Sequence, residues 1–283
     1  MSESPAGSPL QSIGTWDVPH AAAAVVDATG EVAATAGDID RRFRLASVTK
    51  IVTGWTCMIA VEEGVVALDD VVGQDGCTLR HLLAHAGGYA FNGHVPITSP
   101  GRRRIYSNTG MEMAADHVGE RAGLAFARYL AEAVLEPLEW SERTLDGSPA
   151  FGLYGTVRDL TRLLGELMHP RLLSADSAVV VRSTQYADLA GIVPGVGRFD
   201  PCPWGLGVEI RGGKSPHWTG TTNAPETFGH FGAAGTMAWI DPVARCGAVA
   251  LTDRRFDEWP AQALAAWSTM SDAVVSEYGA PAP

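Results

Sequence analysis

Runs of apolar or alternating residues, typical of β-strands, occur near both ends of the chain, at residues 21–27, 31–36, 228–240 and 246–252. The turn residues Ala28-Thr29-Gly30 separate the first two runs, which predicts an N-terminal β-hairpin. A turn at Asp241-Pro242 joins the last two runs, and residues 205–211 form one more candidate strand. The two ends of the chain are therefore expected to supply a sheet.

The middle of the chain has mostly helical spacing, at residues 47–63, 78–86, 109–121, 124–134 and 156–168, and a final helix is expected at 259–278. Gly64 and Gly87-Gly88 end the first two helices. Helices inserted between terminal strands predict a sheet lobe formed by 1–45 with 200–283 and a helical lobe formed by 46–199. A functional site is expected at the boundary between the two lobes.

Composition and charge narrow the class of protein. The 283 residues are 46% hydrophobic and 19% charged, which predicts a globular chain with a large core, and a net charge of −11 disfavours nucleic-acid binding. No apolar run is long enough to span a bilayer, and the first twenty residues lack the features of an export signal, so we expect a cytoplasmic protein without a membrane partner. Four scattered cysteines are expected to be reduced structural thiols without metal: Cys57, Cys77, Cys202 and Cys246.

The segment Ser47-Val48-Thr49-Lys50 stands at the start of the first predicted helix. Residues three apart on a helix share a face, with Cβ atoms about 5–6 Å apart, so Lys50 can reach Ser47. A serine hydroxyl becomes a nucleophile when a base takes its proton, and a lysine serves as that base when burial lowers its pKa. The alternative is that Ser47 caps the helix and Lys50 is solvated.

Two further motifs carry groups that suit the same chemistry. In Tyr106-Ser107-Asn108, the phenol could relay protons and the amide could orient a substrate, although a packed loop tyrosine beside a helix cap is the alternative. In the strand-like segment GHFGAAGT, His230 and Gly232 should share one face. Gly232 would leave room for a substrate, and the N–H of Ala233 could bind an oxyanion.

The order S-x-x-K, Y-x-N, H-x-G resembles class C serine β-lactamases, D-alanyl-D-alanine carboxypeptidases and the esterases that share their fold. Matching stretches follow in family order from Phe43 to Asp253: FRLASVTK, TLRHLLAHAGG, IYSNTG, FGLYGTVRDLTRLLGEL, WGLGVEI and GHFGAAGT. The resemblance implies an α/β-plus-α fold, like that of β-lactamases and penicillin-binding proteins. In that fold an antiparallel sheet is flanked by terminal helices and carries an inserted all-helical lobe.

The resemblance also implies roles for the matched residues and no cofactor or metal. By analogy Ser47 is the nucleophile, and Lys50 and Tyr106 handle its proton. The remaining matched positions would orient the substrate or bind its oxyanion: Asn108, His230 and the backbone N–H groups of Ser47 and Ala233. The partner would be a small-molecule ester, amide or β-lactam.

One departure from the family pattern bears on the substrate. His230 stands where β-lactamases usually carry a lysine that helps to hold a substrate carboxylate, and Lys214 cannot replace it because Pro216 disfavours a paired strand there. An imidazole with an ordinary pKa near 6.5 is mostly neutral at pH 7.5. Small-ester hydrolysis through an acyl-enzyme on Ser47 is therefore favoured. The alternatives are β-lactam or D-Ala-D-Ala peptide hydrolysis and, from another class, a non-catalytic ligand-binding protein.

Two more features resemble functional motifs. His81 and His85 are four apart on a predicted helix, a spacing that holds metals, but no third ligand accompanies them, so packing or hydrogen bonding is expected. The run Arg102-Arg103-Arg104 is expected to be a solvated loop, with steering of an anionic substrate as the alternative.

Overall fold

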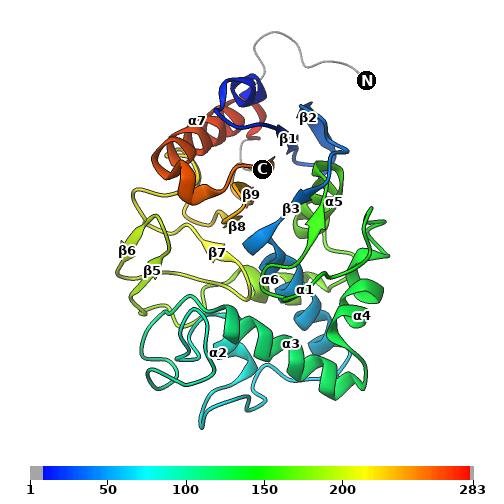
Figure 1. Cartoon of the computed structure of the whole chain (residues 1–283), viewed down its shortest axis with the longest axis vertical. Coiled ribbons are helices and arrows are strands. Elements are labelled where there is room, and N and C mark those ends of the chain that lie inside the picture. Colours follow the sequence, from blue (N-terminus) through cyan, green and yellow to red (C-terminus); the bar gives the residue numbers. More distant parts are fainter. Residues whose placement is uncertain (1–8, 281–283) are drawn as a thin grey trace.

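Strands from both ends of the chain meet in one antiparallel sheet, as the apolar runs predicted (Figure 1). The computed structural model describes residues 9–280; residues 1–8 and 281–283, part of the predicted sheet lobe, lie outside the described residues. The strand order is β2-β1-β10-β9-β8-β7. These strands are β1 (Ala21–Val26), β2 (Val32–Ala36), β7 (Glu209–Ile210), β8 (Phe228–Gly232), β9 (Thr236–Asp241) and β10 (Cys246–Thr252).

The strand β1 joins the N-terminal hairpin to the C-terminal strands. It pairs with β2 as the predicted hairpin, and its other edge pairs with β10, with Ala21 opposite Thr252. Alternate residues of β1 face opposite sides of the sheet, so Ala24 and Val26 belong to one core, whereas Ala23 and Val25 belong to another. The wholly apolar pattern of this strand thus reflects burial on both faces.

The run at 228–240, expected as one strand, is two strands joined by a tight turn. β8 ends at Gly232, β9 begins at Thr236, and the N–H of Gly235 donates to the carbonyl of Gly232 at 2.9 Å. Gly235 has a φ of +83°, which glycine adopts at little cost. The consequence is that Ala233 lies in a turn at the end of the sheet rather than inside a strand.

Helices cover both faces of the sheet. The terminal elements η1 (Pro9–Thr15) and α7 (Pro260–Tyr278) pack on one face, and α5 (Val157–Met168) packs on β1, β9 and β10 from the other. Figure 1 shows α7 and α5 on opposite sides of the sheet. The remaining α- and π-helices are α1 (Thr49–Glu62), α2 (Leu79–Leu83), α3 (Asn108–Ala122), α4 (Phe126–Leu130), the π-helix η3 (Ala131–Leu135) and α6 (Ala175–Arg182).

Several elements differ from the sequence expectations. The helix expected at 78–86 ends at Leu83, and His85 adopts a left-handed φ of +54°. The helix α6 and the hairpin of β5 (Gly191–Val193) with β6 (Gly197–Phe199) were not expected, and the strand expected at 205–211 is reduced to β7. The short strands β3 (Phe43–Arg44) and β4 (Tyr154–Gly155) pair with each other. The lobe boundaries stay a prediction.

A buried ion pair lies behind the aromatic residue Trp204. The amine of Lys214 lies 3.0 Å from Oε1 of Glu209, and both side chains are completely buried. Trp218 donates its indole N–H to the other carboxylate oxygen at 2.7 Å, and His217 Nε2 lies 3.2 Å from Oε1. Lys214 Nζ also lies 5.7 Å from the ring centroid of Trp204, so the pair supports that ring from one side.

We expect Glu209→Gln to lower the free energy of unfolding by about 3–5 kcal/mol at pH 7, because it leaves the buried Lys214 without a counter-charge. Burial alone would raise the pKa of Glu209, but the charge of Lys214 and the bonds from His217 and Trp218 hold it well below its ordinary value. The stabilisation is therefore present above about pH 4.5 and is lost as the pH falls further.

Urea unfolding at pH 7 and at pH 3.5 measures this effect. The difference between wild type and Glu209→Gln should shrink at the lower pH. The control is Glu132→Gln, which breaks the exposed pair with Arg128 and should change stability by less than about 1 kcal/mol. Equal effects of the two substitutions at pH 7 would show that the buried pair contributes no more than a surface pair.

Candidate active site

Ser47 lies in the short 3-10 helix η2 (Ala46–Val48), which leads directly into α1. The preceding residue, Ala46, has a φ of +48°, a left-handed conformation that turns the chain sharply between β3 and the helix. Neither η2 nor α1 has a side-chain cap hydrogen bond, so Ser47 does not act as a helix cap here. Its hydroxyl instead lies 3.1 Å from the amine of Lys50, as the helical spacing predicted.

The amine of Lys50 is completely buried and contacts three neutral groups. Besides the Ser47 hydroxyl, it donates to Oδ1 of Asn108 at 2.7 Å and to the carbonyl of Ala150 at 2.8 Å. Within residues 9–280 no carboxylate lies within ion-pair distance of it. Burial lowers the pKa of Lys50 well below its ordinary value, and the charge of Glu112 opposes this effect to a smaller extent.

The contacts of Lys50 also define the direction of its lone pair. A neutral amine has two N–H groups and one lone pair, and the oxygens of Asn108 and Ala150 can only accept hydrogen bonds. These two acceptors take both N–H groups, so the lone pair is left for the hydroxyl proton of Ser47. The arrangement therefore suits transfer of a proton from Ser47 to Lys50.

The loop that carries the Ala150 carbonyl is tied to the same helix as Lys50. The hydroxyl of Thr53 donates to the carbonyl of Pro149 at 2.6 Å, and the N–H of Leu153 donates to the hydroxyl of Thr49 at 3.1 Å. Two threonines of α1 thus hold the loop on either side of Ala150. Sequence reasoning missed this carbonyl, because a backbone acceptor leaves no signal in residue types.

Tyr106 is packed among aromatic rings and also directs its hydroxyl into the site. Its ring centroid lies 4.7 Å from that of His85 and 5.7 Å from that of Trp204. Its hydroxyl lies 3.3 Å from Nε2 of His230, on a strand 124 residues further along the chain. Burial raises the pKa of Tyr106, an effect that a hydrogen bond with Ser47 opposes only in part, so the phenol keeps its proton at neutral pH.

Asn108 is the first residue of α3, and its amide is held at both ends. Ser107, the N-cap, accepts a hydrogen bond from the N–H of Gly110 at 3.0 Å, which starts the helix. The oxygen of Asn108 accepts from Lys50, and its nitrogen donates to Oδ1 of Asn92 at 3.2 Å. These two contacts fix which end of the amide faces the lysine.

His230 is buried on β8, and its hydrogen bonds define its tautomer. Nδ1 lies 2.5 Å from the carbonyl of Phe231, which can only accept, so Nδ1 carries the proton and Nε2 faces Tyr106 as an acceptor. Burial, with a smaller effect from Lys50, lowers the pKa of His230 to about 3. The expectation of an ordinary pKa near 6.5 was therefore wrong, because it assumed a solvated imidazole.

Gly232 and Ala233 follow at the end of β8. A Cβ at Gly232 would lie 2.4 Å from the carbonyl oxygen of Leu45, so the missing side chain makes room for the backbone next to the nucleophile. The sequence had suggested instead that Gly232 leaves room for a substrate. Leu45 is held there by the hydroxyl of Thr236, which donates to its carbonyl at 2.8 Å. Ala233 lines the same two cavities as Ser47.

Two cavities meet at Ser47 and differ in character. The first, of about 350 Å³, is mostly apolar, and its walls include Tyr106, Trp204 and His230. The second, of about 400 Å³, contains Asn108 and several arginines. Sequence reasoning missed Trp204, which lies in a Gly- and Pro-rich segment without helical or strand periodicity and which packs edge-on to His230.

The two features weighed as possible metal or steering sites have structural roles. His81 accepts from the N–H of Thr78 through Nδ1 at 3.2 Å, while the buried His85 accepts from the N–H of Ser107 at 3.2 Å beneath Tyr106. Arg104, expected in a solvated loop, is only 3% exposed and donates to backbone carbonyls of Ala84, Gln185, Tyr186 and Cys202. A run of arginines here is divided between the surface and the interior.

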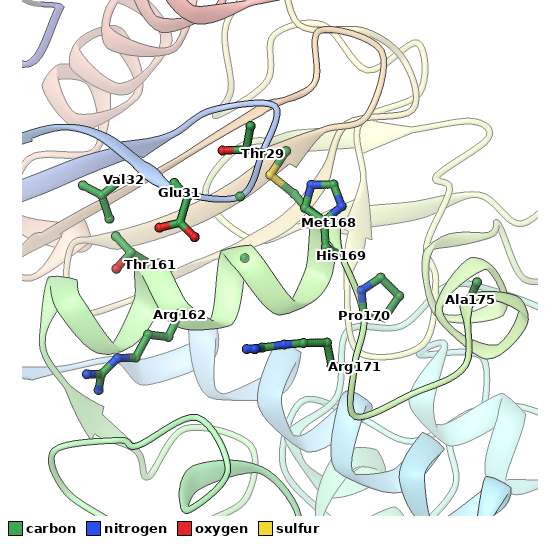
Figure 2. Close-up of a pocket in the computed structure, with 12 residues that line it drawn as sticks. Thr29, Glu31, Val32, Thr161, Arg162, Met168, His169, Pro170, Arg171 and Ala175 are labelled. Atoms are coloured by element: carbon green, nitrogen blue, oxygen red, sulfur yellow. The ribbon is translucent and has the colours of Figure 1, made fainter.

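A further cavity, of about 630 Å³, lies away from this cluster, between the β1–β2 turn and α5 (Figure 2). Thr29 and Glu31 line it from the turn, and Arg162, His169 and Arg171 line it from the helix and the segment that follows. No serine, cysteine or lysine lines it, so it offers no nucleophile and base pair like that at Ser47. Among the described residues we find no group of three metal-ligating side chains and no helix that could cross a membrane.

Comparisons with known proteins identify the family and the fold of the chain. The model of the β-lactamase family matches residues 14–269 of the chain. A crystal structure of a β-lactamase from Mycobacterium bovis has a TM-score of 0.93 and 46% sequence identity, covering 96% of this chain and 100% of that chain. No curated protein matches the sequence.

More distant structures share the fold. Unliganded simvastatin synthase from Aspergillus terreus has a TM-score of 0.76 at 18% identity, covering 96% of this chain and 99% of that chain. A D-stereospecific amidohydrolase from Streptomyces sp. has a TM-score of 0.70 at 19% identity, covering 95% and 96%. The fold is thus the one that the sequence motifs implied, and, because the family model spans most of the chain, this protein belongs to the β-lactamase family.

Proposed function

We propose that the protein hydrolyses small esters through an acyl-enzyme on Ser47. The observation that carries this proposal is the contact between the Ser47 hydroxyl and the amine of Lys50, whose pKa burial lowers, at the junction of two cavities. Lys50 takes the hydroxyl proton as Oγ attacks the carbonyl carbon of the ester. The N–H groups of Ser47 and Ala233 then bind the oxyanion of the tetrahedral intermediate.

Collapse of this intermediate breaks the bond between the carbonyl carbon and the ester oxygen. The leaving alcohol needs a proton, and the neutral phenol of Tyr106 supplies it and recovers one from the protonated Lys50. Water then attacks the acyl-enzyme and gives a proton to the same lysine, which passes it to the Oγ of Ser47 as the acyl–oxygen bond breaks, so the carboxylic acid leaves and the serine hydroxyl is restored. Asn108 holds the lysine in place throughout through its 2.7 Å contact.

The preference for an uncharged substrate group on the side of the first cavity rests on His230 and the walls of that cavity. With a pKa of about 3, His230 is uncharged throughout the physiological range, so it offers no cation to a substrate carboxylate on that side. The apolar walls of the cavity include Phe231 and Phe256 and favour an uncharged group. β-Lactam hydrolysis is the second candidate, favoured by the name of the 46% identical structure from Mycobacterium bovis.

Covalent labelling and substrate comparison test the function and rank the two candidates. We expect a fluorophosphonate to label the wild type but not Ser47→Ala, and kcat/KM for 4-nitrophenyl butyrate to exceed that for nitrocefin. Ser12→Ala, in the distant η1, is the matched control and should be labelled normally. Preference for nitrocefin would favour the β-lactamase candidate, whereas reversible binding of ligands without labelling or turnover would indicate a non-catalytic protein.

Lys50→Arg tests the identity of the base. Because a guanidinium keeps its proton near neutral pH, we expect kcat for 4-nitrophenyl butyrate to fall by about 10²–10⁴-fold. In the wild type, burial lowers the pKa of Lys50, so kcat/KM should fall as the pH drops through that lowered pKa and the amine takes up a proton. Near wild-type turnover in Lys50→Arg would contradict the assignment.

Tyr106→Phe separates packing from proton transfer, because it keeps the ring and removes only the hydroxyl. We expect turnover to fall by about 10²-fold or more with little change in Tm, since the ring contacts with His85 and Trp204 remain. Circular dichroism melting and steady-state kinetics on the same preparation measure both effects. A large loss of Tm with unchanged activity per folded molecule would indicate that Tyr106 only packs.

A further inference from the structure

The second cavity at Ser47 is rich in arginine. Its lining contains the nucleophile and four arginines, at positions 41, 42, 44 and 255, but only two acidic or amide side chains, Asp253 and Asn108. In a protein with a net charge of −11, such a concentration of cations beside the candidate nucleophile is unusual. A positively charged cavity of this kind favours an anionic ligand.

Three of the four arginines already have acidic partners. Arg42 binds Glu142 through two contacts at 2.5 and 2.9 Å, and Arg255 binds Asp257 at 2.8 Å. Arg41 lies 3.5 Å from Asp253. The carboxylate of Asp253 is shared, because Nδ1 of His20 lies 2.6 Å from the same oxygen.

Arg44 differs from these three. Among residues 9–280 no carboxylate lies within ion-pair distance of its guanidinium, whose central carbon lies 6.0 Å from the ring centroid of Phe151. Phe151 lines the same cavity, so this ring orients an otherwise unpaired cation along the cavity wall. An exposed arginine with an available fork of N–H donors is suited to a carboxylate.

The backbone places Arg44 close to the nucleophile. Arg44 is the last residue of β3, where it pairs with Tyr154, and the buried Phe43 points into the core beside it. Arg44 and Ser47 are only three positions apart in the chain, so their Cα atoms are at most about 11 Å apart. An acyl chain of about six carbons attached to Ser47 could therefore bring a terminal carboxylate to Arg44.

The position of Tyr106 indicates which part of the substrate lies on the arginine side. Tyr106, the proposed proton donor to the leaving alcohol, lines the apolar cavity, whereas Asn108 lines the arginine-rich one. The leaving alcohol must contact the group that protonates it, so it belongs in the apolar cavity. The acyl group then extends into the cavity with Arg44.

We propose that the preferred substrate is the ester of an apolar alcohol with an acyl group that carries a second, ionised carboxylate, and that Arg44 binds this carboxylate. The proposal rests on the proposed esterase function and specifies its substrate class. The two sides of the site differ in charge because His230 is neutral at the apolar cavity while Arg44 is an unpaired cation at the other. The carboxylate bound by Arg44 takes no part in bond breaking.

Two esters of equal chain length test the proposal: 4-nitrophenyl hydrogen adipate, which carries the carboxylate, and 4-nitrophenyl hexanoate, which does not. We expect the wild type to prefer the adipate ester and the ratio of kcat/KM values to fall about tenfold in Arg44→Gln, given one partly screened charge-assisted contact. Arg128→Gln removes the same charge from the exposed face of α4 and should leave the ratio unchanged.

Equal ratios in wild type, Arg44→Gln and Arg128→Gln would overturn the proposal. In 3-carboxy-4-nitrophenyl hexanoate the carboxylate is on the leaving phenol. A preference for this ester over the adipate ester would overturn the assignment of the alcohol to the apolar cavity and of the acyl group to the arginine-rich one. If neither ester is hydrolysed, the esterase function fails, and equilibrium binding to Ser47→Ala then decides the inference separately. Monobutyl adipate should bind Ser47→Ala more tightly than butyl hexanoate does, and adding Arg44→Gln should remove the difference. Equal binding of the two esters to Ser47→Ala would refute the role of Arg44.

Discussion

The amine of Lys50, buried without a carboxylate partner, is the constraint on which the rest of the site depends. A charged ammonium in this position would lose its hydration without compensation, so burial favours the neutral form and makes the group a base. Its three oxygen contacts come from η2, α3 and the loop at Ala150, which lie far apart in the sequence. The fold is thus arranged so that three separate segments converge on one nitrogen.

The residues that surround Lys50 and its direct contacts also avoid adding a positive charge beside its amine. His230 and His85 are both held neutral by burial, so neither adds a positive charge beside Lys50. Of the full charges buried nearby, Glu209 and Lys214 are paired with each other behind Trp204, and Arg104 donates to backbone carbonyls. The groups that directly contact Lys50 are therefore polar but uncharged, and the low dielectric of such a setting strengthens hydrogen bonds to a developing oxyanion.

Arginine side chains gather in only one of the two cavities at Ser47. The arginine-rich cavity gathers residues from β3 and from the segment after β10, whereas the opposite cavity is formed by aromatic rings and the β5–β6 hairpin. The two cavities differ because β8 ends at the turn of Ala233 beside η2, which carries Ser47. Different loops therefore border the site on the two sides of Ser47. A substrate bound at Ser47 therefore meets an apolar environment on one side and a cationic environment on the other.

Local patterns in the sequence were enough to predict the N-terminal hairpin, the long helices and the proximity of Ser47 to Lys50, because turns, apolar periodicity and helical spacing act over a few residues. The resemblance of the motifs to β-lactamases implied the fold. Only the tertiary structure decided that His230 is buried beneath Tyr106, that Arg104 lies in the interior and that Arg44 stands unpaired beside the nucleophile. Burial and pairing depend on segments distant in the chain, so the same residue type is a solvated charge in one place and a buried or ligand-facing group in another.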